Sequence, residues 1–429
     1  MKRILFLLVT ILATSVSYAQ LNPLQRVKDR AKAKVQQKID QKTDEAVDNV
    51  LEPNKKNKKT STQDNGTAEG GTSGGNKPSM ETYSKFDFVP GEKVIMQEDF
   101  TKDNIGDFPD KWNTNGSGEI VTVNTRDGRF LMTKKEVVMY PEWVKNLPEN
   151  FTLEFDLITT DNFSFYSGWF VVGVTTSGNI GKDFRSFGRF GNGRIDNGGG
   201  FEIGFHPENA GGQQGITSAF GSLNHEEVLK NEADQNYLVV PQKPFAHISI
   251  WRQKGRVRVY MDEKKVWDLP RLVADGLKLN SIYFRNDGSS NANDAFYVGN
   301  IRVAVGAPDT RNKLITEGKF VTRGILFDVN SDKIKAESYG VIKDIANVLK
   351  ENPEVKVKIV GHTDSDGDEA KNLELSKKRA EAVKQFLIKE FGIDASRITT
   401  DGKGESQPSD SNTTSEGKAN NRRVEFIKQ

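Results

Sequence analysis

Two side chains of opposite charge flank a strand-to-helix transition near the end of this sequence. The β-branched run VKVKIV is followed by the segment GHTDSDGDEAKNLELSKKRAEAV. Asp364 lies at the start of this segment, and Arg379 lies farther along in its helical part. A carboxylate accepts hydrogen bonds from an ammonium group, and the planar guanidinium fork binds a carboxylate through two parallel hydrogen bonds. The pair therefore predicts a site for a ligand that carries both charges. The alternative is that Asp364 only caps the helix and that Arg379 is a solvated or ion-paired surface residue.

Alternating strands and long helices must position these two residues. The segments GILFDV, EVKVKIVG, RITTDG and NRRVEFIKQ are predicted strands, whereas residues 331–353 and 368–392 are predicted helices. This alternation predicts an α/β two-layer domain over residues 315–429.

The same stretch resembles the signature of the OmpA-like C-terminal, peptidoglycan-associating domain. In that family a Gly-x-Thr-Asp-x-x-Gly turn precedes an Asn and then Leu-Ser-x-x-Arg-Ala, and the matching positions here are Gly361, Thr363, Asp364, Gly367, Asn372, Leu375, Ser376, Arg379 and Ala380. The segment ILFDVNSDKIK resembles the family's first strand and turn, and GKGESQPSDSN and NRRVEF complete the pattern over residues 320–429. Lys371 is a departure, because the family often has an aromatic residue there.

The resemblance implies that the domain binds the peptidoglycan stem peptide at meso-diaminopimelate, whose free end carries one ammonium and one carboxylate. It implies that Asp364 accepts from the ammonium and that Arg379 binds the carboxylate, with neutral hydrogen bonds from Thr363 and Asn372. The residues expected to support the site are Phe327, Asn330, Leu375, Arg422 and Arg423. The resemblance also implies a periplasmic protein, associated with the wall and the outer membrane of a Gram-negative cell.

Residues 85–306 have a different pattern, with short runs such as FTLEFDLIT, FEIGF and RVRVYMD separated by turn residues. This pattern predicts an all-β sandwich of the jelly-roll type. The opening segment and the closing strand YVGNIRVAV resemble the concanavalin-A/laminin-G-like superfamily. We expect the sandwich to bind a glycan or a protein partner.

A glycosidase is the alternative function for the sandwich. Some concanavalin-type glycoside hydrolases use a Glu-x-Asp-x-x-Glu strand, which places two carboxylates on one face. Here FTLEFDLIT supplies Glu154 and Asp156 but has Thr159 at the third position. We therefore expect no catalytic residue. A wall-anchored carbohydrate-active enzyme would require these two carboxylates to lie in a concave groove beside another one.

The first 84 residues divide into three predicted parts. Residues 1–19 have the basic start, apolar stretch and small residues of a secretory signal peptide, with an uncleaved anchor as the alternative. Residues 20–52 predict an amphipathic stalk helix with a narrow apolar stripe, suited to self-association through residues 21–52 or to a membrane surface. Residues 53–84 are rich in Lys, Gly, Ser, Thr and Asn and predict a flexible, disordered linker.

Composition excludes several further classes. The net charge is +2 over 429 residues, which argues against a nucleic-acid partner. The absence of Cys excludes disulfides, thiolate zinc sites and a thiol nucleophile. The segment DSDGDE is similar to part of a calcium loop, but Leu375 occupies the place of the required bidentate Glu. We expect no metal and no cofactor.

Overall fold

The structure is a computed structural model that describes residues 86–179, 199–209, 214–224, 226–306, 310 and 312–429. The predicted signal peptide at 1–19, stalk helix at 20–52 and linker at 53–84 lie outside these residues, so they stay predictions. The pattern of residue contacts divides the chain into two units, Met1–Asn76 and Lys77–Gln429, and all described residues belong to the second unit.

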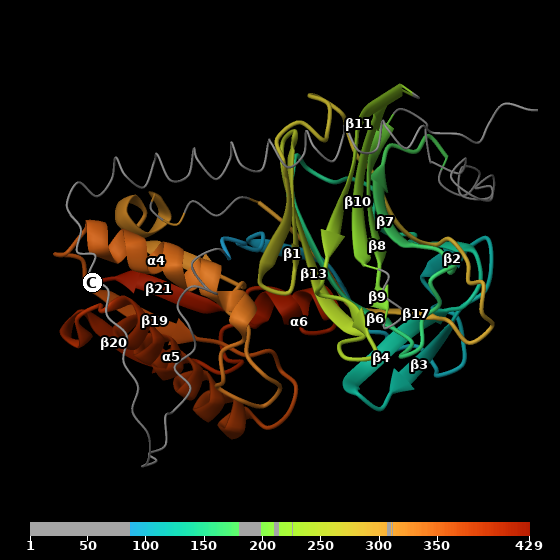
Figure 1. Cartoon of the computed structure of the whole chain (residues 1–429). Coiled ribbons are helices and arrows are strands. Elements are labelled where there is room, and N and C mark those ends of the chain that lie inside the picture. The colour runs from blue at the N-terminus through green and yellow to red at the C-terminus, as the bar shows by residue number, and fades with distance from the viewer. Residues whose placement is uncertain (1–85, 180–198, 210–213, 225, 307–309, 311) are drawn as a thin grey trace, which may run out of the picture. The chain divides into compact units, whose positions relative to one another are not determined.

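The first part of the described chain forms two antiparallel sheets (Figure 1). The eight-stranded sheet has the spatial order β15 (Lys264–Leu269), β14 (Arg256–Met261), β13 (Phe245–Gln253), β6 (Asn150–Thr159), β17 (Phe296–Val305), β4 (Arg126–Thr133) and β3 (Glu119–Val123), and β1 (Lys93–Glu98) also pairs with β17. The seven-stranded sheet has the order β11 (Glu226–Gln235), β10 (Gly215–Leu223), β8 (Gly199–His206), β7 (Phe170–Thr175), β16 (Ser281–Asn286), β5 (Val137–Pro141) and β2 (Trp112–Thr114). A short parallel pair joins β9 (Glu208–Asn209) to β12 (Val239–Val240).

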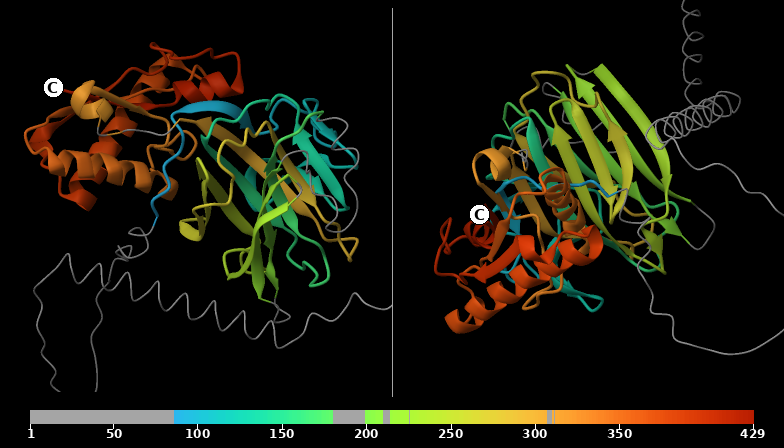
Figure 2. Two further views of the ribbon diagram at one scale, coloured as in Figure 1. Left: turned by 90° about the horizontal axis from the view of Figure 1, so that it is seen from above. Right: turned by 90° about the vertical axis from the view of Figure 1, so that its left-hand side faces the viewer.

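The two sheets enclose one apolar core, and Figure 2 shows the sheets from two further directions. Phe155 of β6 contacts Phe170, Phe205 and Phe284 of the opposite sheet, with ring centroids 5.4–6.3 Å apart. Burial of these rings is the main stabilising contribution expected for such a layer. The sandwich predicted from alternating strands is therefore confirmed at the level of two packed sheets, while its assignment as a jelly roll remains a proposal.

Strand β11 was missed by the sequence pattern. Its sequence EEVLKNEADQ is charged and mostly exposed, and the strand pairs with β10 alone at the edge of its sheet. An edge strand without a buried face lacks the apolar alternation on which the prediction depends.

The C-terminal part is a two-layer α/β domain. Its sheet has the order β18 (Lys319–Thr322), β21 (Val424–Lys428), β19 (Val357–Gly361) and β20 (Ile398–Gly402), with β19 and β20 parallel. The helices are α4 (Tyr339–Glu351), α5 (Glu369–Phe391) and α6 (Ser415–Asn421), with short turns η1 (Asn312–Thr316), η2 (Ala336–Ser338) and η3 (Ala395–Arg397). Helix α5 packs on β19 and β20 and also contacts α4. No helix in the described ranges has the length and apolar character needed to cross a membrane.

Two sequence predictions for this domain were wrong. The segment GILFDV does not form a strand, apart from an isolated bridge between Phe327 and Ile334. The free edge of β21 is instead taken by residues 319–322, at and just after the end of the predicted joint 307–319, where the sequence predicted no strand. The predicted helix at 331–353 begins only at Tyr339, because the preceding residues form the tight turn that returns the chain to Phe327.

The sandwich and the C-terminal domain are joined by specific contacts within the same unit. The side-chain amide of Asn420 both accepts from Val94 N at 2.9 Å and donates to Val94 O at 3.0 Å. Arg323 donates to Glu92 O at 2.7 Å. These bonds satisfy backbone groups of strand β1 and of the chain just before it, so they fix the sandwich to α6 and to the residue that follows β18.

Candidate functional site

The site is built on the turn between β19 and α5. Asp368, rather than Asp364, is the N-cap of α5, and its side chain accepts from Lys371 N at 3.0 Å. Gly392 ends the helix in the left-handed region at φ 68°, which a residue without Cβ adopts at little cost. Asp364 is therefore not needed as a helix cap, which leaves its carboxylate available to other partners.

Asp364 has an internal cationic partner. Its Oδ2 accepts from Arg422 Nη1, and its Oδ1 accepts from Asp366 N at 3.2 Å. The Asp364 side chain is mostly buried, whereas 44% of the Arg422 side chain is exposed. The sequence placed Arg422 only in a supporting role, and nothing in its spacing indicated this ion pair across two loops.

Arg379 extends from α5 toward the turn after Phe327. Its Nε donates to Ser331 O at 2.9 Å, and its guanidinium lies 4.9 Å from the centre of the Phe327 ring. Asn330 shapes this turn with φ 52°. Within the described ranges Arg379 forms no ion pair with a carboxylate. Burial and the nearby positive charge of Arg422 lower the pKa of Arg379, although it remains charged at neutral pH.

The other predicted residues organise the turn. Asn372 donates to Glu405 Oε2 at 2.6 Å, to Asp366 O at 3.0 Å and to Asp364 O at 3.3 Å. The Thr363 hydroxyl is buried and has no hydrogen-bond partner among the described residues. Leu375 is half-buried in α5. Asn372 thus positions the backbone that presents Asp364, while any contact of Asn372 or Thr363 with a ligand stays a prediction.

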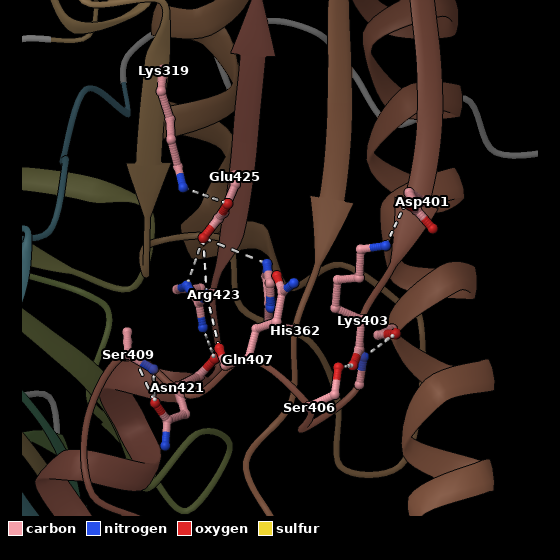
Figure 3. A network of polar contacts seen from close by, with 12 residues as sticks. Lys319, His362, Asp401, Lys403, Ser406, Gln407, Ser409, Asn421, Arg423 and Glu425 are labelled. Carbon is pink, nitrogen blue, oxygen red and sulfur yellow. Dashed lines mark hydrogen bonds and ion pairs between the residues drawn. The ribbon is translucent and has the colours of Figure 1, made fainter.

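Arg423 belongs to a buried ionic network beneath the turn (Figure 3). Its Nε donates to Glu425 Oε1 at 2.9 Å, and Glu425 also contacts Lys319 at 2.7 Å and His362 at 3.5 Å. Burial opposes ionisation of Glu425, but contacts with His362 and Lys319 hold its pKa well below the usual value. Arg423 therefore supports the start of the inner strand β21, next to which Arg422 reaches Asp364.

Arg379 and Arg422 both line a cleft of about 1130 Å³. The cleft also includes residues of the sandwich, among them Arg126, Glu154 and His247. We refer to this space as the cleft below.

Glu154 and Asp156, the two carboxylates considered for a glycosidase, lie in this cleft but are each paired with a base. Glu154 accepts from Arg302 Nη1 at 2.6 Å, and Asp156 contacts His247 Nδ1 at 2.7 Å. Burial raises the pKa of both carboxyl groups, but these contacts outweigh burial and lower it. The cleft also contains further carboxylates, among them Asp262 and Glu263, so the geometric condition stated for a wall-anchored enzyme is met. A general acid for glycoside cleavage requires a raised carboxyl pKa, however, and neither Glu154 nor Asp156 has one.

The fold defines a two-layer α/β domain in which Arg379 and Arg422 line an open cleft. Asp364 is paired with Arg422 and is not itself among the residues that line the cleft. Residues 326–422 match the family model described as the OmpA family, so this part of the chain is an OmpA family domain. The resemblance stated from the sequence is confirmed for this region.

Related proteins match the same region. Outer membrane porin F of Pseudomonas aeruginosa is 44% identical over 101 residues, covering 24% of this chain and 29% of porin F. Probable lipoprotein YiaD of Escherichia coli is 41% identical over 127 residues, covering 27% of this chain and 58% of YiaD. The chain thus spans less than two thirds of the length of each of these relatives. The structure of the peptidoglycan-associated lipoprotein from Burkholderia pseudomallei aligns with 26% identity and a TM-score of 0.24, covering 28% of this chain and 98% of that one.

Proposed function

We propose that this protein is a non-enzymatic component of the cell envelope that binds peptidoglycan non-covalently through the diaminopimelate of the stem peptide. The observation that carries the proposal is Arg379, a half-buried arginine that lines an open cleft without a carboxylate partner among the described residues. A ligand carboxylate would supply that partner in bidentate geometry. Asp364, on the neighbouring turn, would accept from the ligand ammonium after sharing or replacing its contact with Arg422.

Location and the remaining partners follow from the same proposal. The OmpA family domain and its outer-membrane relatives support a periplasmic protein at the cell wall and outer membrane of a Gram-negative cell. We assign the two-sheet domain to the concanavalin-A/laminin-G-like class and propose a glycan or a protein as its ligand. Residues 21–52 would add self-association or a membrane contact.

Co-sedimentation of the full chain with purified diaminopimelate-type peptidoglycan tests the site. Asp364→Ala leaves the ligand ammonium unpaired and Arg379→Ala leaves its carboxylate unpaired, so each should weaken binding by about tenfold or more. Arg379→Lys keeps the charge but loses the planar fork, and it should also weaken binding. Lysine-type peptidoglycan lacks the second carboxylate and should bind poorly to the unmodified chain.

Lys378→Ala is the matched control, because Lys378 is an exposed base adjacent to Arg379 on α5 whose ion pair, within the described residues, is with Glu374. It should sediment as the unmodified chain does. If the double variant Asp364→Ala/Arg379→Ala remains folded and still sediments normally, the assignment of this site is wrong.

A further inference from the structure

The cleft extends from the OmpA family domain along the sandwich. Its volume of about 1130 Å³ exceeds the roughly 300–1,000 Å³ typical of small-molecule sites. The free end of one diaminopimelate residue would occupy only part of this space. A peptide bound at Arg379 therefore has room to continue along the sandwich wall.

The sandwich wall is fixed to the C-terminal domain. Arg302 of β17 donates to Glu154 Oε1 at 2.6 Å and to Arg323 O at 3.4 Å. Arg323 in turn donates to Asn420 O at 3.0 Å, and Asn420 lies two residues before Arg422. Because these bonds connect both walls, groups on the sandwich are positioned before a ligand arrives.

Most charged groups on the sandwich wall are already paired, but Arg126 is an exception. Lys243 pairs with Asp262, and His247 contacts Asp156. Arg126 is exposed and stacks on Phe245, with its guanidinium carbon 3.2 Å from the ring centre. It donates no hydrogen bond to a carboxylate in the part of the chain that the structure describes. Stacking orients the guanidinium plane and leaves its N–H edges available for an anion.

Four acidic groups that form no ion pair in the described ranges also line the cleft, namely Asp99, Asp127, Glu263 and Glu337. The cleft therefore presents unpaired groups of both signs. Such walls suit a peptide that carries an ammonium and several carboxylates better than they suit a simple anion.

We propose that Arg126 forms a second carboxylate subsite, which binds the free α-carboxylate of the γ-linked glutamyl residue next to diaminopimelate in the stem peptide. This inference rests on the proposed function, because it requires diaminopimelate to be bound at Asp364 and Arg379. The sandwich then contributes to peptide recognition, and the cleft binds a peptide segment rather than one amino acid.

Isothermal titration of the full chain with three probes tests the subsite. The probes are free meso-diaminopimelate, the tripeptide L-alanyl-γ-D-glutamyl-meso-diaminopimelate, and the same tripeptide with the glutamyl α-carboxylate amidated. Arg126→Ala should weaken binding of the acidic tripeptide about three- to fivefold, as expected for an exposed ion pair. It should leave binding of diaminopimelate and of the amidated tripeptide unchanged, and the loss should shrink at high salt.

Arg271→Ala is the control, since Arg271 is an exposed arginine of the sandwich that does not line the cleft. Arg126→Lys should keep part of the preference for the acidic tripeptide. If Arg126→Ala weakens both tripeptides equally, or neither, while the unmodified chain binds diaminopimelate, the subsite is wrong and the proposed function stands. If the unmodified chain binds none of the probes, both proposals fail.

Discussion

At the scale of single residues, the two predicted ligand groups differ in how they are prepared for binding. Asp364 already contacts Arg422, so a ligand ammonium must compete with an internal cation. Arg379 has its guanidinium positioned by a carbonyl and an aromatic ring, without a competing carboxylate in the described ranges. We therefore expect Arg379 to contribute more binding free energy than Asp364, because less existing interaction is lost there.

His362, which precedes Thr363 and Asp364 in the sequence, does not serve as a neutral control for the site. Its side chain is fully buried and lies 3.5 Å from Glu425. Replacing it by Ala would remove a partner of a buried carboxylate, which is usually destabilising. The exposed Lys378 is the better control for this helix.

His247 gives a prediction about pH. Burial disfavours its charged form, but Asp156 and Glu154 outweigh burial and raise the pKa of His247 well above 6.5. A histidine whose pKa is higher in the folded than in the unfolded chain stabilises the folded state when it is protonated. This stabilisation is complete below the pKa of the unfolded chain, about 6.5, and is lost as the pH rises through the pKa of the folded state. The free energy of unfolding should therefore differ most between the unmodified chain and His247→Gln at pH 6 and below, and least at alkaline pH.

The control for this measurement is His206→Gln. Burial lowers the pKa of His206, so protonation of His206 at low pH destabilises the folded state. The difference in the free energy of unfolding between the unmodified chain and His206→Gln should therefore change with pH in the opposite direction. Denaturant titrations at several pH values compare the two variants. A pH-independent difference for His247→Gln would show that the imidazole is not held in its charged form.

At the scale of elements, the backbone of α4 packs closely against the segment that precedes β1. A Cβ at Gly340 would lie 2.2 Å from Phe88 O, in the segment that precedes β1. Gly340→Ala should gain about 1 kcal/mol of helix propensity but lose more by forcing the backbones apart, since overpacking costs about 1–3 kcal/mol. We expect a net loss of stability in chemical denaturation.

Gly178→Ala is the matched substitution in an open position, because no heavy atom lies within 4 Å of its added Cβ. Its effect should stay within about 0.5 kcal/mol. Equal stability of the two variants would mean that Phe88 does not pack on α4 in solution.

At the scale of the whole molecule, contacts between the sandwich and the C-terminal domain bear on whether the two unfold together. The division at 85–306 and 315–429 predicts from the sequence that each part folds alone, and this stays a prediction; Lys77–Gln429 form a single unit of contacts. Phe86 and Phe88 pack on Tyr260 of the sandwich and form one apolar cluster with Tyr339 of α4. Apolar burial between the domains should make them unfold together.

Limited proteolysis measures this coupling. Composition predicts cleavage within residues 53–84, and the protected product should extend to the C-terminus without a cut near residue 310. Asn420→Ala removes both bonds to Val94 and should increase cutting at the joint, since each bond contributes about 0.5–1.5 kcal/mol. Two separate protected fragments from the unmodified chain would contradict the coupling.

The sequence alone was sufficient for what depends on local pattern. The extent of α5, the strand β19 and the order of charged residues around the turn are encoded within short segments, so they could be predicted together with the family, whereas the N-cap at Asp368 was missed. Alternating apolar runs were likewise sufficient for a two-sheet sandwich, because burial of alternate side chains is a local signal.

Only the tertiary structure decided which groups meet across long separations. The Arg422–Asp364 pair, the edge strand β18, the Asn420 bonds to Val94 and the common cleft of Arg126 and Arg379 join residues far apart in the chain. No periodicity encodes such contacts, because they depend on how whole elements pack. For the same reason the sequence placed Arg379 at the binding site but gave no sign that the sandwich forms the opposite wall.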